Sequence, residues 1–154
     1  MAHKHPLFEA RPRHFPIHVN EHVRWGDLDA FGHVNNTIYF QWFESARMEF
    51  LQRTGFMDLM HDRNIGPILA HTECFFRRPL GHPCELLVAT RSGDVDARRF
   101  AMEYGIFERT DEMPLAACGT GIVVCYDYNE RCKAQIPEPL RQRLLELGSS
   151  DHDH

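Results

Sequence analysis

The sequence predicts an α+β domain in which an antiparallel sheet accompanies one long helix. Three observations predict this class. An alternating apolar segment lies at residues 15–25, a segment with helical periodicity follows it, and turn-separated, strand-like segments occupy the second half. The expected order is therefore one strand, a long helix and a meander of about four strands, with no internal repeat.

The first strand is expected within residues 15–25, FPIHVNEHVRW, because apolar residues there recur at alternate positions. The period then changes. From Asn36 to about Thr54, apolar side chains gather on one arc at about 100° per residue, which indicates a helix with a broad apolar face. Asn35 or Asn36 is a suitable N-cap, and Gly55 is a suitable end. We expect this helix to be central and mostly buried.

Strands are expected next, within residues 66–80, 84–94, 98–110 and 115–128. Three glycines inside these segments indicate bulges or close backbone approach: Gly105, Gly119 and Gly121. Prolines start a short final helix within residues 136–147, IPEPLRQRLLEL.

The length of 154 residues suits one domain, expected over residues 15–147 between flexible ends at 1–14 and 148–154. The hydrophobic fraction of 43% and the charged fraction of 25% are those of a folded protein. No apolar run approaches the about 18 residues of a membrane span, and the N-terminus lacks the apolar core of a signal peptide. We expect a cytoplasmic protein that does not bind membranes.

Charge and cysteine content also exclude some functions. The net charge of −5 argues against nucleic-acid binding, which needs an excess of cations to neutralise phosphates. The five cysteines include no CxxC pair, so we expect small buried residues rather than a zinc site, and no metal site.

The most informative stretch is WGDLDAFGHVNN, residues 25–36, which joins the first strand to the long helix. Asp27 and Asp29 lie just before the predicted helix start, where a carboxylate can cap backbone N–H groups. The same position suits catalysis, because free N–H groups at a helix start can receive a charged oxygen. The residues alone leave both readings open.

The motif and the element order resemble the hotdog-fold acyl-CoA thioesterases of the 4-hydroxybenzoyl-CoA thioesterase type. The family pattern is a strand, Asp-x-Asp-x-x-Gly, and an aromatic helix carrying Tyr and Glu-x-x-Arg. The stretch RWGDLDAFGHVNNTIYFQWFESAR contains the matching residues Asp27, Asp29, Gly32, Tyr39, Glu44 and Arg47, and FFRRPL resembles a later strand end. The resemblance covers about residues 15–140. It implies a sheet of about five strands wrapped around the long helix, and subunits paired with active sites at their interface, as a homodimer or tetramer.

The resemblance implies hydrolysis of the thioester of a small or medium acyl-CoA. Asp29 takes the position of general base or nucleophile, and the backbone amides of Gly32, His33 and Val34 that of oxyanion donors. Asp27 is expected to support the site, and a role for the His33 side chain stays open. Asn36 stands where one branch has a helper histidine, and asparagine cannot exchange a proton near neutral pH.

In other branches of the hotdog fold, a glutamate on the helix is the catalytic base, so Glu44 is the alternative to Asp29. We rank Glu44 lower because Asp29 matches the position of the base in this branch. The phosphates of coenzyme A need cations, and the candidates are Arg77, Arg78, Arg98 and Arg99, although adjacent strand residues point to opposite faces. Aromatic side chains near the motif, Tyr39 and Trp25 with Phe31, Trp42 and Phe43, are candidates to line an acyl pocket. No cofactor is expected, because coenzyme A is part of the substrate.

Two other functions compete. A hotdog enoyl-CoA hydratase or dehydratase uses an Asp and a His about four residues apart, and Asp29 and His33 have this spacing. The Asn-Pro typical of that loop is missing here. A hotdog domain that binds acyl-CoA without cleaving it is the non-enzymatic alternative.

Overall fold

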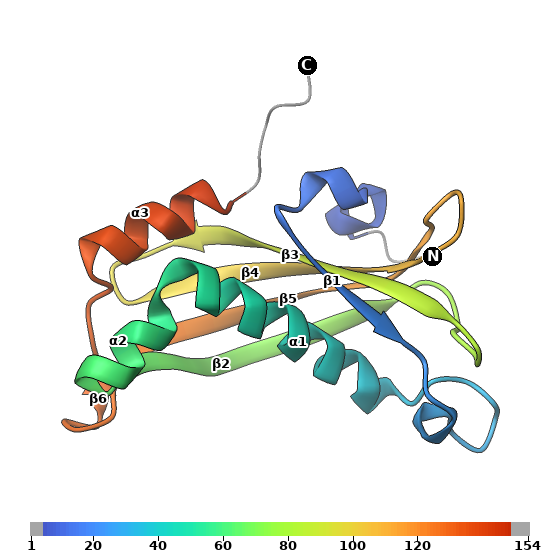
Figure 1. The fold of residues 1–154 in the computed structure, drawn as a ribbon, viewed down its shortest axis with the longest axis horizontal. Helices are drawn as coiled ribbons and strands as arrows, with labels where there is room; N and C mark the ends of the chain where they lie inside the picture. The colour runs from blue at the N-terminus through green and yellow to red at the C-terminus, as the bar shows by residue number, and fades with distance from the viewer. Residues whose placement is uncertain (1–4, 149–154) are drawn as a thin grey trace.

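The computed structural model describes residues 5–148 and contains a curled antiparallel sheet packed against one long helix (Figure 1). The sheet order is β1-β3-β4-β5-β2, with β6 paired to β5. The strands are β1 (Ile17–His22), β2 (Ile65–Phe76), β3 (Glu85–Val95), β4 (Arg99–Glu108), β5 (Leu115–Asp127) and β6 (Cys132–Lys133). The helices are α1 (Asn36–Thr54), α2 (Phe56–Arg63) and α3 (Glu138–Glu146). The predicted hotdog fold is confirmed.

Helix α1 has the bounds that the sequence predicts. Its N-cap is Asn35, whose side-chain oxygen accepts the Thr37 N–H at 3.0 Å. It ends at Gly55, which adopts a left-handed conformation with φ of 92°. Because the cap is Asn35, the side chain of Asn36 is left for other contacts.

The apolar arc of α1 packs on the concave face of the sheet. The Phe43 ring is fully buried and stacks on Tyr104 of β4, with ring centroids 4.5 Å apart and planes 14° from parallel. Gly119 of β5 makes room for this ring, since a Cβ there would lie 2.5 Å from Phe43 Cε2 and 2.4 Å from the Glu73 carbonyl oxygen. The close approach predicted for Gly119 is therefore confirmed.

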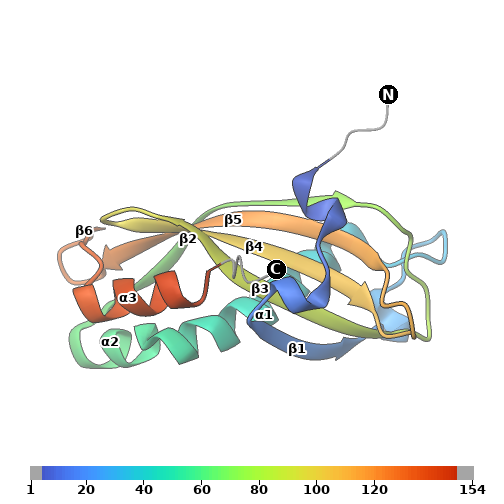
Figure 2. The ribbon, with the colours of Figure 1, turned by 90° about the horizontal axis from the view of Figure 1, so that it is seen from above.

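The outer face of the sheet is also covered, by the segment that precedes β1. The first 3₁₀ turn, Pro6–Glu9, lies on the side of the sheet away from α1 (Figure 2), and a second 3₁₀ turn, Pro12–His14, connects it to β1. Leu7 is 3% exposed and belongs to a second apolar cluster with residues of β3, β4 and β5. This cover explains why the run Leu86–Thr90 of β3 is buried at every position instead of alternating.

This arrangement differs from the flexible segment predicted for residues 1–14, because residues 5–14 form packed turns. Their apolar side chains are too few to show a periodicity in the sequence. Residues 1–4 and 149–154 of the predicted flexible ends lie outside the described residues. Between residues 5 and 148, no helix is both long and apolar enough to cross a membrane.

Two elements were not predicted. Helix α2 directly follows Gly55 and buries Phe56, whose ring centroid lies 5.6 Å from that of Phe100. Strand β6 pairs two residues with the end of β5. The predicted final helix is confirmed as α3, which buries Leu144.

Candidate active site

The motif forms a tight loop between β1 and α1. Trp25–Asp27 make one 3₁₀ turn, and Leu28 then pairs with Val34 in an antiparallel bridge. The loop that this bridge closes reverses direction at Gly32, whose φ of 80° lies in the left-handed region that favours glycine. The loop thereby presents Asp29 beside the start of α1.

The two carboxylate oxygens of Asp29 have different surroundings. Its Oδ1 accepts the backbone N–H groups of Phe31 at 2.9 Å and His33 at 3.2 Å, which fixes the side chain to its own loop. Its Oδ2 has no hydrogen bond to any residue that the structure describes. Asp29 therefore both stabilises the loop and keeps one oxygen for a ligand.

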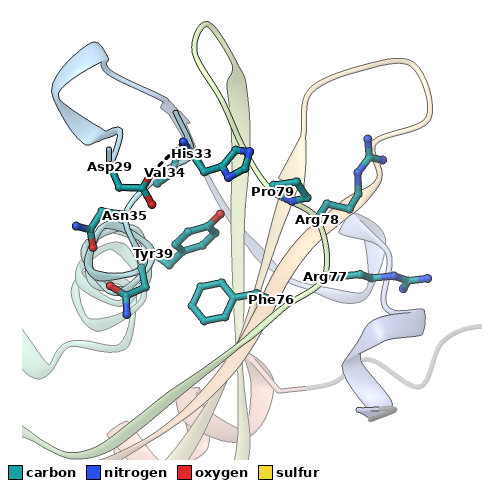
Figure 3. Close-up of a pocket in the computed structure, with 10 residues that line it drawn as sticks. Asp29, His33, Val34, Asn35, Tyr39, Phe76, Arg77, Arg78 and Pro79 are labelled. Carbon is teal, nitrogen blue, oxygen red and sulfur yellow. Dashed lines mark hydrogen bonds between the residues drawn. The ribbon is translucent and has the colours of Figure 1, made fainter. Parts of the chain in front are cut away.

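Asp29 lines a cavity of about 530 Å³ between the start of α1 and the end of β2 (Figure 3). Tyr39 and Phe76 form its apolar floor, with their rings edge to face and centroids 4.9 Å apart. The remaining lining residues are His33, Val34, Asn35, Asn36, Arg77, Arg78 and Pro79. Phe76 was not predicted, although it stands next to the predicted Arg77.

The hydroxyl of Tyr39 points into this cavity (Figure 3), although the residue as a whole is only 3% exposed. Burial, followed by the nearby groups of Cys74, Cys84 and Glu108, raises the pKa of Tyr39 to about 12. The phenol is therefore neutral at physiological pH and can donate a hydrogen bond to a ligand oxygen.

The backbone amides predicted as oxyanion donors are engaged within the protein. The Gly32 N–H donates to the Asp29 carbonyl oxygen at 3.1 Å, and the Val34 N–H to the Leu80 carbonyl oxygen at 2.9 Å. The His33 N–H donates to Asp29 Oδ1. None of the three is a free donor, because the loop uses them to hold its own shape. The remaining donors that line the cavity include the Tyr39 hydroxyl and the side-chain amide of Asn36.

Other predicted acids lie outside the cavity. Asp27 Oδ2 accepts the Arg24 N–H at 2.8 Å, and the Asp27 carbonyl oxygen accepts the Asn35 N–H, also at 2.8 Å. Asp27 thus supports the loop that carries Asp29. Glu44 is exposed on α1 and does not line the cavity. His33 lines it next to Asp29.

The four predicted arginines are divided between the two ends of the sheet. Arg77 and Arg78 lie on the rim of the cavity, with their guanidinium groups directed away from Asp29 (Figure 3). Arg98 and Arg99 lie at the β3–β4 turn, at the opposite end of the sheet (Figure 1), in a separate cavity with Lys133. They do not join the cavity of Asp29 within this chain, because β4 runs the length of the sheet between the two ends.

Trp25 was also expected beside the substrate, but it does not line the cavity. It is 76% exposed, and its ring meets that of His82 edge to face at 5.9 Å. Phe31 is likewise exposed, whereas Trp42 and Phe43 belong to the core. Of the predicted aromatic residues, the fold places Tyr39 at the cavity.

The cysteines are free thiols with different burial. Cys118 and Cys125 are buried, and burial raises the pKa of Cys118 to about 12. Cys74 and Cys84 are partly buried and Cys132 is exposed, so the expectation of five buried cysteines is confirmed for Cys118 and Cys125 and is wrong for Cys132. Across residues 5–148, no group of three or more His, Cys, Asp and Glu side chains is arranged to hold a metal ion.

Each comparison with known proteins finds thioesterases among the similar proteins. The model of the thioesterase-like superfamily matches residues 23–144. The chain is 29% identical over 131 residues to ATL3, an acyl-acyl carrier protein thioesterase of Arabidopsis thaliana chloroplasts, covering 84% of this chain and 67% of that protein.

Two solved structures share the fold. A thioesterase superfamily protein of Jannaschia sp. CCS1 has a TM-score of 0.78 and 26% identity, covering 84% of this chain and 82% of that chain. A thioesterase of Thermus thermophilus, solved with coenzyme A and Zn, has a TM-score of 0.73 and 29% identity, covering 84% of this chain and 98% of that chain. These matches agree with the predicted enzyme class, a thioester hydrolase. The chain belongs to the thioesterase-like superfamily.

Proposed function

We propose that the protein hydrolyses the thioester bond of small or medium acyl-CoA substrates, with Asp29 as the catalytic carboxylate. The observation that carries this proposal is the free Oδ2 of Asp29 at the wall of a cavity whose floor is aromatic. An apolar floor suits the acyl group, and a carboxylate facing it suits attack on the acyl carbon.

In the water-mediated form of the reaction, Asp29 Oδ2 removes a proton from water as the water oxygen attacks the acyl carbon. The carbonyl oxygen gains negative charge and accepts hydrogen bonds from the Tyr39 hydroxyl and the Asn36 amide. The C–S bond then breaks, and the thiolate leaves as the thiol with the proton from Asp29. In the covalent form, the carboxylate itself attacks the acyl carbon, the C–S bond breaks and the thiolate leaves, so that a mixed anhydride forms. Water then cleaves the anhydride, which restores the Asp29 carboxylate and releases the acid, and the thiolate takes up a proton from water. Neither form needs a cofactor.

The acyl group is proposed to be aromatic or short and aliphatic, as in the 4-hydroxybenzoyl-CoA type. The edge-to-face pair of Tyr39 and Phe76 supports this choice, because a flat ring can stack on such a floor. Coenzyme A as the carrier is supported by the Thermus thermophilus relative that was solved with it. Arg77 and Arg78, at the rim of the cavity that contains Asp29, supply cations for the phosphates of this carrier.

We also propose that the protein is at least a homodimer, paired through the outer edge of β2. Within the described residues, β2 is hydrogen-bonded to β5 on one edge and unpaired on the other. Ile68 and Leu69 in its middle are each 40% exposed. A long apolar edge strand favours pairing with a second copy.

The proposed activity is tested with a panel of aromatic and short aliphatic acyl-CoA thioesters, by following release of the free thiol. We expect turnover by the wild type and loss of about 10²–10⁴-fold in kcat for Asp29→Asn. Hydration of crotonyl-CoA, measured in parallel, identifies the hydratase alternative. A protein that binds these thioesters and cleaves none would contradict the proposal, as would an Asp29→Asn variant with near wild-type kcat.

A further inference from the structure

A second cleft of about 190 Å³ adjoins the candidate active site. One wall is the packed N-terminal segment, which contributes Phe8, Glu9, Ala10 and Arg11. The other wall contains Arg77 and Arg78, which also line the cavity of Asp29. The two hollows therefore share Arg77 and Arg78 as lining residues.

Specific contacts between the two walls hold this cleft in shape. Arg77 Nη1 donates to the Phe8 carbonyl oxygen at 2.6 Å, and its guanidinium carbon lies 5.5 Å from the centre of the Phe8 ring. These contacts hold the guanidinium of Arg77 against the N-terminal segment, with further N–H groups left to donate.

The charge of the cleft is positive in a chain whose net charge is −5. Arg78 Nη2 lies 3.2 Å from Glu108 Oε2, so this arginine is partly neutralised. Glu9 contributes the one carboxylate among the lining residues. Arg11 and Arg77 are the cations that face the cleft without an acidic partner among the described ion pairs.

We propose that this cleft binds a phosphate group of the thioester carrier, with Arg11 and Arg77 as its ligands. The proposal rests on the proposed function, because the pantetheine arm is the chain that links a thioester to phosphate. A guanidinium group matches phosphate oxygens with paired N–H donors. The N-terminal segment is thereby part of the substrate site, and Arg11 is a binding residue.

Calorimetric titration with unacylated probes tests the cleft without requiring turnover. The probes are coenzyme A, 3′-dephospho-coenzyme A, 4′-phosphopantetheine and pantetheine. We expect Arg11→Ala and Arg77→Ala each to weaken coenzyme A binding about tenfold, the loss of one charged hydrogen bond. Pantetheine, which lacks phosphate, should bind all variants equally. Arg98→Ala, at the opposite end of the sheet, is the matched control and should bind like wild type.

The probes also identify which phosphate is bound. A loss shared by 4′-phosphopantetheine and coenzyme A assigns the phosphate next to pantetheine, whereas a loss seen with coenzyme A alone assigns the nucleotide phosphates. Arg11→Lys keeps the charge and should recover part of the affinity. A coenzyme A affinity within twofold of wild type for both alanine variants overturns the proposal, as does a wild type that does not bind coenzyme A.

This outcome is separate from that of the catalytic proposal. Weakened coenzyme A binding together with absent thiol release would retain the phosphate site and reject hydrolysis. If Arg11→Ala and Arg77→Ala hydrolyse acyl-CoA normally and bind coenzyme A as tightly as wild type, hydrolysis is retained and the phosphate site is rejected.

Discussion

Asp29 and His33 are joined by two hydrogen bonds, from the Asp29 N–H to the His33 carbonyl oxygen at 2.7 Å and from the His33 N–H to Asp29 Oδ1 at 3.2 Å. This pair closes the loop in front of α1 and orients the carboxylate. One oxygen is used by the loop and the other is left for chemistry, so capping and catalysis are not exclusive at this residue.

The loop role and the chemical role of Asp29 are separable by comparing two substitutions. Asp29→Asn keeps an oxygen for the two amides but loses the charge, so we expect stability close to wild type with lost turnover. Asp29→Ala loses both, and we expect it to lower the free energy of unfolding by about 0.5–2 kcal/mol as well. Chemical denaturation and thiol release measure the two effects. Equal stability of the two variants would contradict the loop role.

Removing the Tyr39 hydroxyl should slow the reaction with little change in stability. We expect Tyr39→Phe to lower kcat by about tenfold or more, because a hydrogen bond to the developing oxyanion is lost. Tyr104→Phe is the control, since its hydroxyl accepts from Arg47 at 3.1 Å inside the core. That variant should lose stability and keep kcat. Unchanged kcat in Tyr39→Phe would remove this hydroxyl from the mechanism.

Alkaline unfolding should report the burial of Tyr39. Burial raises its pKa to about 12, whereas a tyrosine in the unfolded chain ionises near pH 10. The unfolded state therefore loses this proton first, and the contribution of the neutral phenol to stability is complete below pH 10 and lost as the pH rises through 12. Between these values, the free energy of unfolding should fall less steeply in Tyr39→Phe than in wild type. If the free energy of unfolding falls with pH at the same slope in both proteins, the Tyr39 hydroxyl is not buried from solvent.

A side chain at position 119 should disturb the contact between α1 and the sheet. We expect Gly119→Ala to destabilise the protein by about 1–3 kcal/mol, because its Cβ would overlap the Phe43 ring and the Glu73 carbonyl oxygen. Gly26→Ala is the control, since a Cβ there meets nothing within 4 Å. Denaturation midpoints measure both. Similar losses for the two variants would indicate a general cost of replacing glycine.

A charge on the free edge of β2 should oppose self-association. We expect Leu69→Lys to shift the protein toward a monomer, because pairing of two edges would bury an unpaired ammonium group. Leu145→Lys on α3, where the side chain is 54% exposed, is the control. Light scattering after size-exclusion chromatography measures the mass. A wild-type monomer, or a Leu69→Lys variant with unchanged dimer mass, would contradict edge pairing.

Much of the local structure could be predicted because local signals agree along the chain. The bounds of α1 follow from Asn35, the apolar arc and Gly55, all of which lie within or next to the helix. Helix α2 was not predicted because it has eight residues and follows α1 directly, with its stability supplied by Phe56 packing on Phe100.

The candidate site was predicted in part. The motif indicates Asp29, and the structure adds which of its oxygens is free. The amides of Gly32 and Val34 looked like donors, because a sequence does not show that neighbouring carbonyl groups already accept them. Arg98 looked equivalent to Arg77 by composition, yet the two arginines lie at opposite ends of the sheet.

By itself, the sequence determined the order of the main elements, the ends of α1, and the loop that carries Asp29 and Gly32. Periodicity, capping and turn preferences act between residues a few positions apart, so the chain displays them directly. Only the tertiary structure decided that Phe76 faces Tyr39, that the N-terminal segment meets Arg77, and that Trp25 stays exposed. Those relationships depend on the strand register and on which face each element covers, and both arise from packing between distant parts of the chain.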